Sequence, residues 1–369
     1  MAELGYAKEL LVLPFDHRSS FLDKLLGIKG RQPNQVEARL VASYKDIVYD
    51  GFKKALFLGV PKDKAAVLVD EQFGQRCLED AKMRGDFAFC MPVEKSGQDE
   101  FDFEFGVKYA AHIEKFAPTF TKVLVRYNVE ANYDVNKRQA ERLKTLSDYL
   151  KHVSRKFMFE LLVPPTPLQL EECGGDVNRY DVEKRPALMV AAIKALQAAK
   201  VEPDVWKLEG LATAEAAKAV CDAARTGGRM KVGVIVLGRG ESAEKVKEWL
   251  QVGARVAGVI GFAVGRTVFW DALALFKDRK HPREVAVELI AKNYKALADL
   301  WVESRGVSRP PRVGTGTTGV ISRVPSVASP GSRVIAKAPV AAGDATGGVP
   351  SAPAPSGGGE EIAKTPPPA

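Results

Sequence analysis

Short apolar runs alternate along the chain with longer stretches whose apolar residues recur at the helical period. Continuous apolar runs are typical of parallel strands that are covered on both faces. The runs predict strands at 10–15, 65–69, 87–91, 122–125, 157–163, 204–210, 232–237 and 257–262. The helical stretches lie at 35–56, 75–83, 106–116, 135–154, 185–200, 212–224, 242–250 and 267–276, with a last one at 282–301.

Eight strand–helix units in this length are typical of a (β/α)8 barrel, an α/β fold. We therefore predict one barrel domain over residues 1–306. An open doubly wound sheet is the alternative, but no G-x-G-x-x-G sequence follows the first run. The last helical stretch, 282–301, is expected to pack outside the barrel or at an interface.

Residues 307–369 differ in composition from the rest of the chain. They contain no Leu, Met, Cys or aromatic residue and are rich in Gly, Pro, Ala and Ser, so we expect a disordered tail. The first 306 residues hold 48 basic and 43 acidic side chains, mixed along the sequence. This balance suits a small anionic substrate and lacks the dense basic block typical of nucleic-acid binding.

Cysteine spacing and hydropathy bear on the compartment. The four cysteines form no C-x-x-C pair, no apolar run reaches membrane-spanning length, and no signal pattern opens the chain. We expect a cytoplasmic protein with no membrane partner. The sequence does not decide the oligomeric state, and a homo-oligomer is compatible with it.

Charged residues cluster where the predicted strands end, which is where barrel enzymes place their chemistry. Most of them could form salt bridges that seal the barrel mouth, as we expect for Glu71 and Glu209. Glu160 and Lys207 differ because they sit within their strands. The residues at the strand ends are Asp16, His17, Arg18, Asp70, Glu71, Arg126, Asn128, Glu160, Lys207, Glu209, Arg239 and Arg266.

A lysine inside an apolar strand is a candidate nucleophile, because burial favours the neutral amine. Lys207 could attack a ketone and form an iminium that accepts electrons when a carbon–carbon bond breaks. Glu160, on the neighbouring strand, could move protons to and from the nitrogen. Asp16 could polarise or deprotonate the hydroxyl at the bond that breaks.

Strands seven and eight both end in glycine and arginine. Gly238-Arg239-Gly240 and Gly265-Arg266 each precede a helical stretch, and barrels commonly bind phosphate at these two loops. Glycine lets the backbone approach an anion, and arginine adds charge-assisted hydrogen bonds. The two motifs together predict a phosphorylated ligand.

Four segments resemble a group of class I barrel aldolases that includes tagatose-1,6-bisphosphate aldolase. The nearest resemblance is to the 2-deoxy-5-keto-gluconate-6-phosphate aldolase domain of inositol catabolism, and it runs from about Leu10 to about Phe276. Where the tagatose-bisphosphate relatives have a lysine at the end of strand four, this chain has Arg126. The segments are 14–18 (PFDHR), 69–74 (VDEQFG), 206–209 (WKLE) and 265–270 (GRTVFW).

The resemblance implies a TIM-barrel lyase that needs no cofactor. Lys207 would form the Schiff base, Glu160 would be the acid/base and Asp16 a second catalytic carboxylate. The expected substrate is 2-deoxy-5-keto-gluconate 6-phosphate, which would be cleaved to dihydroxyacetone phosphate and malonate semialdehyde. The substrate-binding residues would be Arg18, Arg126, Asp70, Gly238, Arg239, Gly265 and Arg266.

Other functions stay open at this point. Another ketose phosphate, such as tagatose 1,6-bisphosphate, could be the substrate, and Glu160 could serve an isomerase with Lys207 as an electrostatic clamp. A non-catalytic sugar-phosphate-binding barrel is a further alternative. A zinc enzyme is disfavoured, because only His17 of the four histidines is predicted at the mouth.

Overall fold

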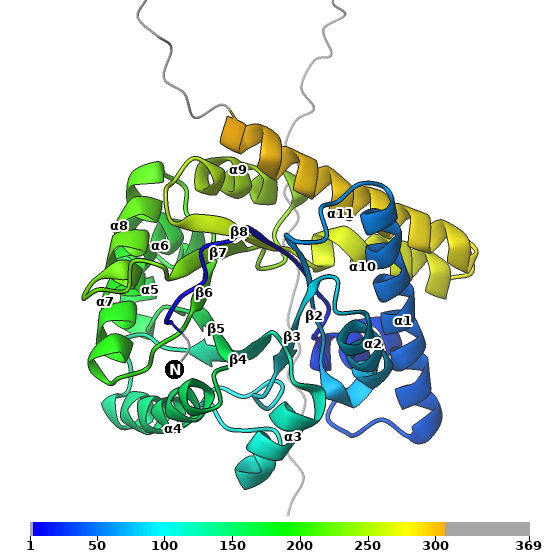
Figure 1. Cartoon of the computed structure of the whole chain (residues 1–369). Coiled ribbons are helices and arrows are strands. Elements are labelled where there is room, and N and C mark those ends of the chain that lie inside the picture. Colours follow the sequence, from blue (N-terminus) through cyan, green and yellow to red (C-terminus); the bar gives the residue numbers. More distant parts are fainter. Residues whose placement is uncertain (1–2, 307–369) are drawn as a thin grey trace, which may run out of the picture. The chain divides into compact units, whose positions relative to one another are not determined.

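The computed structural model describes residues 3–306, which form a closed barrel of eight parallel strands (Figure 1). Consecutive strands are neighbours, and β1 pairs with β8 to close the sheet. This confirms the predicted (β/α)8 fold; the predicted tail lies outside the described residues. The strands are β1 (Leu10–Pro14), β2 (Ala65–Leu68), β3 (Ala88–Pro92), β4 (Phe120–Arg126), β5 (Lys156–Leu162), β6 (Val205–Glu209), β7 (Gly233–Leu237) and β8 (Val259–Ala263).

Helices surround the barrel, and α11 lies across the outside of α1, α9 and α10 (Figure 1). A π-helical turn η1 (Phe21–Leu25) follows β1, and a 3₁₀ turn η2 (Gly106–Lys108) precedes α3. The α-helices are α1 (Gln35–Phe57), α2 (Glu71–Arg84), α3 (Tyr109–Phe116), α4 (Tyr133–His152), α5 (Pro167–Glu172), α6 (Val177–Glu183), α7 (Arg185–Ala198), α8 (Ala214–Arg225), α9 (Ala243–Ala254), α10 (Arg266–Lys277) and α11 (Arg283–Gly306).

The strands are apolar on both faces because each face packs against a different core. One core fills the space between sheet and helices, and the other fills the inside of the barrel. Side chains alternate between the two faces along each strand. The inner core consists of Leu10, Val12, Ala66, Leu68, Cys90, Phe120, Met158, Val205, Ile235, Ile260 and Ala263.

Local capping explains two differences from the sequence prediction. Helix α2 begins at Glu71 instead of residue 75, because the Asp70 side chain accepts a hydrogen bond from the Phe73 N–H and caps the helix. Helices α5 and α6 were not predicted. Thr166 and Gln169 form a capping box that starts α5, and this sequence signal was available.

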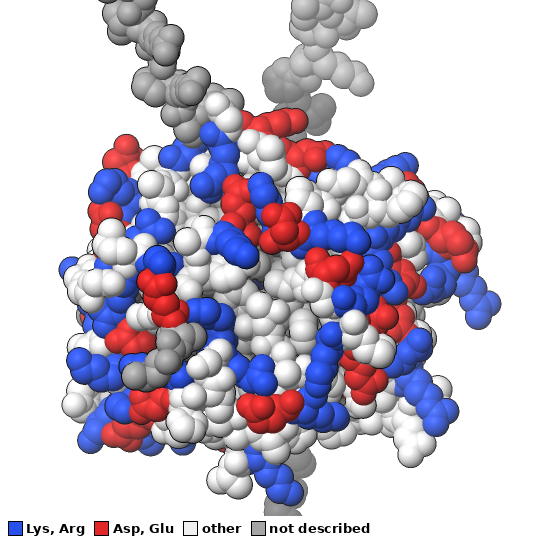
Figure 2. Space-filling view, in the orientation of Figure 1, with Lys and Arg blue, Asp and Glu red and all other residues white. Residues whose placement is uncertain are grey.

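The surface of the barrel carries mixed charge. Figure 2 shows Lys and Arg interspersed with Asp and Glu over the face it draws, without a block of one sign. Among the described residues, no helix is both long and apolar enough to cross a bilayer.

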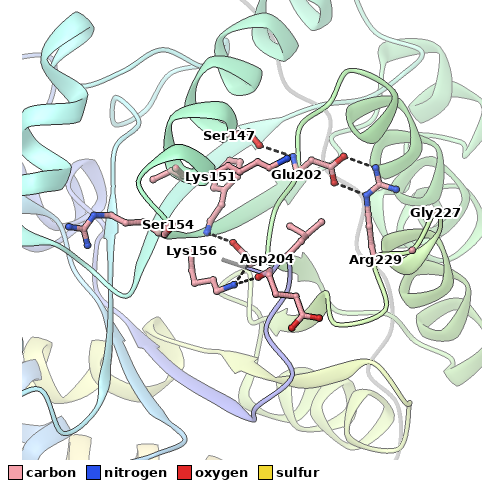
Figure 3. Close-up of a pocket in the computed structure, with 14 residues that line it drawn as sticks. Ser147, Lys151, Ser154, Lys156, Glu202, Asp204, Gly227 and Arg229 are labelled. Carbon is pink, nitrogen blue, oxygen red and sulfur yellow. Dashed lines mark hydrogen bonds and ion pairs between the residues drawn. The ribbon is translucent and has the colours of Figure 1, made fainter. Parts of the chain in front are cut away.

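A cavity of about 270 Å³ lies where β5 and β6 begin, at the opposite end of these strands from the candidate site (Figure 3). Four of the charged residues in its wall form two ion pairs, Glu202 with Arg229 at 2.6 Å and Lys156 with Asp204 at 2.9 Å. Asp204 also accepts hydrogen bonds from the backbone N–H groups of Gly5 (2.7 Å) and Phe157 (2.8 Å). This cluster ties the N-terminal segment to the barrel, which is a structural role.

Replacing Asp204→Ala should lower the free energy of unfolding by about 3 kcal/mol, because it leaves two N–H donors and the Lys156 ammonium without their shared acceptor. Urea denaturation would measure the loss. The control is Glu3→Ala, which removes an exposed pair with Lys231 and should cost less than about 0.5 kcal/mol. Equal losses for the two variants would contradict the role assigned to Asp204.

Candidate active site

Two lysines and three carboxylates meet inside the barrel where its strands end. The Lys122 ammonium lies 2.9 Å from Asp16 Oδ2, 2.8 Å from Glu94 Oε1 and 2.9 Å from Glu160 Oε2. Lys207 Nζ lies 2.7 Å from the same Glu160 Oε2. None of these five side chains is more than 10% exposed.

Strand register brings the cluster together. Glu160 on β5 and Lys207 on β6 are direct cross-strand partners, so their side chains leave the sheet on the same face. Lys122 lies two residues after Phe120 on β4, and the Phe120 side chain belongs to the inner core. The charges therefore stand on an apolar floor, where electrostatic interactions are stronger than in water.

The carboxylates differ in proton affinity. Burial raises the pKa of Asp16 and of Glu160, but the ammonium charges of Lys122 and Lys207 outweigh burial and hold both pKa values below the usual range. For Glu94 burial wins over the same Lys122 charge and over Arg18, so its pKa is raised. Burial lowers the pKa of Lys122, and the surrounding carboxylates overcompensate, so the net pKa of Lys122 is well above its usual value.

Two cavities open on either side of Lys207. The cavity between the ends of β1 and β4, hereafter the β1–β4 cavity, has a volume of about 210 Å³ and contains Asp16, Glu94 and Lys122 in its wall. The cavity over the ends of β7 and β8, hereafter the β7–β8 cavity, has a volume of about 60 Å³. His17, Glu160 and Lys207 line both, so a ligand that spans the two cavities passes the Lys207 amine.

The β7–β8 cavity contains the predicted glycine–arginine loops. Gly240 has φ +85°, and a Cβ there would lie 2.3 Å from the Arg266 guanidinium carbon. A Cβ on Gly265 would lie 2.1 Å from the carbonyl oxygen of Pro14, so this glycine is required for packing against β1. Gly238 also lines the cavity, as do Arg266 and Thr267, the first two residues of α10, whose N–H groups have no acceptor among the described residues.

The two arginines of these loops differ. Arg239 donates to Asp181 at 2.6 Å and lies 3.3 Å from Glu209, so carboxylates already hold its guanidinium. Arg185 lies against the same two acids. Arg266 donates to the Arg239 carbonyl oxygen, and no carboxylate of the described chain lies within 4.0 Å of its guanidinium. Arg266 is thus the arginine better placed to meet an anion.

The predicted arginines of the β1–β4 cavity also differ. Arg18 is buried, and it donates to Glu104 at 2.9 Å and to the Glu94 carbonyl oxygen at 2.6 Å. Arg18 therefore anchors the loop after β3. Arg126 is 36% exposed; it donates to the Gln98 carbonyl oxygen at 2.5 Å and lies 4.0 Å from its nearest carboxylate, Asp99.

Asp70 does not join the other predicted residues. Its carboxylate forms a fully buried ion pair with Lys45 and caps α2, and it lies outside the walls of both cavities. Lys45 also donates to the Phe15 carbonyl oxygen at 2.8 Å. Asp70 therefore connects β1, α1 and α2, which is a structural role.

His17 lies between the two cavities, with its ring edge-on to Phe269 at 6.1 Å between ring centroids. Burial lowers the pKa of His17 to about 4, against the opposing pull of Asp16 and with the help of Arg266. The ring is neutral at pH 7. Its buried Nδ1 has no hydrogen-bond partner among the described residues.

Sequence analysis missed Lys122 and Glu94. Arg126 was the predicted cation of strand four, whereas the structure places the buried cation four residues earlier, at Lys122. A lysine beginning the apolar run 122–125 was the available signal. Glu94 lies two residues beyond Pro92, the last residue of β3, and no charged residue was predicted at the end of that strand. The described residues contain no group of three or more His, Cys, Asp or Glu placed to hold a metal ion.

The fold and the site define a (β/α)8 barrel whose interior presents a buried lysine amine beside a buried carboxylate. The chain belongs to the family described as "Uncharacterized protein conserved in bacteria (DUF2090)", whose family model matches residues 3–305. A search of curated protein sequences finds no match.

Solved structures with a similar fold include a fructose-bisphosphate aldolase from Plasmodium falciparum, determined in complex with TRAP and a small-molecule inhibitor. It is 14% identical, the alignment covers 83% of this chain and 93% of that one, and the TM-score is 0.57. An archaeal fructose 1,6-bisphosphate aldolase is 14% identical, with 80% and 94% coverage and a TM-score of 0.49. The likeness to the aldolase from Plasmodium falciparum shows the barrel fold alone.

Replacing Lys122→Met should lower the free energy of unfolding at pH 7 by about 3–5 kcal/mol, because three buried carboxylates lose their shared cation. Lys122 holds the pKa values of Asp16 and Glu160 down, so its stabilisation is present above the unfolded carboxyl pKa of about 4 and is lost as the pH falls. The deficit should therefore shrink below about pH 5.

Urea denaturation at several pH values would measure this dependence. Lys144→Met is the matched control, because its partner Asp148 is exposed on the same helix and the pair should contribute less than about 0.5 kcal/mol. A deficit for Lys122→Met that is independent of pH would show that the lysine stabilises the fold by packing alone.

Proposed function

We propose that this protein is a class I aldolase that forms a Schiff base between Lys207 and the ketone of a phosphorylated sugar acid. The observation that carries the proposal is the buried contact of 2.7 Å between Lys207 Nζ and Glu160 Oε2, at the point where two cavities meet. The fold of the aldolase from Plasmodium falciparum, with a TM-score of 0.57, supports the same assignment by analogy.

The two lysines suit different roles. Lys122 contacts three carboxylates, which hold it as a permanent ammonium. Among the carboxylates of residues 3–306, Lys207 pairs with Glu160 alone, and it shares that carboxylate with Lys122. Glu160 can take a proton from Lys207 before attack, and it can then deliver one to the carbinolamine hydroxyl that leaves as water.

The phosphate is expected in the β7–β8 cavity. Arg266 supplies a guanidinium that pairs with no carboxylate of the described chain, and the backbone of Arg266 and Thr267 supplies two N–H groups without an acceptor there. Lys207 lines both cavities, so a ketone that reacts with its amine would lie at the edge of the β7–β8 cavity. A phosphate bound in that cavity would then be on the carbon next to the ketone. Arg239, Gly238 and Gly265 shape the loops around it.

The substrate that fits this arrangement is 2-deoxy-5-keto-gluconate 6-phosphate, with its ketone beside the phosphorylated carbon and a carboxylate at the far end. Arg126 is the preferred partner of that carboxylate, because Arg18 is held by Glu104 and the Glu94 carbonyl oxygen. Cleavage between C3 and C4 would give dihydroxyacetone phosphate and malonate semialdehyde. Asp16 lies beside Lys122 as a second carboxylate of the reaction centre.

Borohydride reduction in the presence of dihydroxyacetone phosphate should attach the triose to Lys207, because reduction converts the imine to a stable amine. Mass spectrometry of the intact protein and its peptides would detect the adduct. Lys207→Ala should abolish both the adduct and cleavage, whereas Lys95→Ala, which removes another cavity lysine, should keep the adduct. An unmodified wild-type protein, or activity retained by Lys207→Ala, would rule out the imine mechanism.

Replacing Arg266→Met should raise KM for the phosphorylated substrate about 10–100-fold, because a charge-assisted hydrogen bond to phosphate is lost. Arg239→Met should raise KM less and should lower the free energy of unfolding more, since its guanidinium pairs with Asp181 and Glu209. Steady-state kinetics and urea denaturation of both variants would test this contrast. The opposite order of KM effects would move the phosphate to Arg239.

A further inference from the structure

The loop after β3 contributes Glu94, a cavity carboxylate that has no role in the mechanism proposed above. Glu94 Oε1 accepts from Lys122 at 2.8 Å, and the Arg18 side chain clamps the backbone of Glu94 through its carbonyl oxygen. The side chain is more than nine-tenths buried and lines the β1–β4 cavity. Oε2 has no hydrogen-bond partner among the described residues.

We propose that Glu94 is the residue that exchanges a proton with the hydroxyl oxygen at the carbon–carbon bond that breaks. This inference rests on the proposed aldolase function and adds an acid/base to it. In the cleavage direction, the hydroxyl O–H bond breaks and its proton goes to Glu94. The O–H electron pair forms the new aldehyde C=O bond, the carbon–carbon bond breaks, and its electron pair moves onto the iminium to give the enamine. Condensation runs the same transfers in reverse.

The position of Glu94 separates it from the chemistry at nitrogen. Glu160 contacts Lys207 directly, which suits formation and hydrolysis of the imine. The hydroxyl that loses its proton lies several bonds beyond the imine nitrogen, so its proton acceptor must lie further along the cavity. Glu94 meets this condition, because Lys122 stands between it and Glu160.

Asp16 also contacts Lys122, but its environment suits a different role. Lys122 and Lys207 hold the pKa of Asp16 below the usual range, so it remains an anion that positions Lys122. Burial raises the pKa of Glu94, which brings it nearer to the neutral range in which a carboxyl group can both accept and return a proton. A rotation of the carboxyl group, which has a broad torsional preference, exchanges its two oxygens.

The decisive variant is Glu94→Gln, which keeps an acceptor for Lys122 but cannot take a proton. It should retain borohydride trapping of dihydroxyacetone phosphate on Lys207 and solvent deuterium exchange into that triose, because trapping needs only the iminium and exchange goes no further than the enamine. Cleavage of the full substrate should fall by about 10²–10⁴-fold. The acidic limb of the kcat/KM profile, which the wild type should show as Glu94 becomes protonated, should disappear from the residual activity.

Two further variants separate catalysis from structure. Glu104 pairs with Arg18 and lies outside the wall of the β1–β4 cavity. The variant Glu104→Gln should therefore cleave the substrate at a rate within about threefold of the wild type. Urea denaturation checks that Glu94→Gln is folded, and Glu94→Asp, which keeps a carboxyl group one methylene away, should recover part of the lost cleavage.

The outcomes are distinguishable. A wild-type protein that is never trapped on Lys207 overturns the aldolase function itself. Trapping with full cleavage by Glu94→Gln overturns the role of Glu94 alone. If Asp16→Asn loses cleavage, keeps deuterium exchange and abolishes the acidic limb while Glu94→Gln does none of these, the proton acceptor is Asp16.

Discussion

The site depends on one buried ammonium group that three carboxylates share. Asp16 follows β1, Glu94 follows β3 and Glu160 lies on β5, and Lys122 supplies the positive charge that compensates their burial together in an apolar interior. These contacts fix Lys122. Lys207 pairs with one carboxylate of the described chain, Glu160, and shares it with Lys122. This difference between two buried lysines separates a structural cation from a candidate nucleophile.

Charges at the strand ends fall into two groups according to the direction in which they point. One group points into the barrel and lines the cavities. The other ties helices to the sheet, as Asp70 does with Lys45. Arg239 belongs to both groups, because it lines the β7–β8 cavity and pairs with Asp181 and Glu209. The strand ends of a barrel therefore serve both catalysis and assembly, and the residue type alone does not distinguish the two.

Unpaired polar atoms are concentrated at the cavity that would receive the non-phosphorylated end of the ligand. Of the buried side-chain atoms without a partner in residues 3–306, four belong to residues of its wall: His17 Nδ1, Arg18 Nε, Glu94 Oε2 and Gln98 Nε2. Leaving such atoms unpaired costs stability. Their concentration here is consistent with a site organised for a polar ligand.

The local sequence pattern is enough to predict the barrel, because continuous apolar runs at regular spacing leave few other ways to cover both faces of a sheet. It also singles out Lys207 and Glu160, because charged residues inside such runs are conspicuous. The folded chain was needed to show that Lys122 and Glu94 join them, that Asp70 does not, and that carboxylates already hold Arg239. These outcomes depend on strand register and on contacts between residues far apart in the chain, which local patterns do not encode.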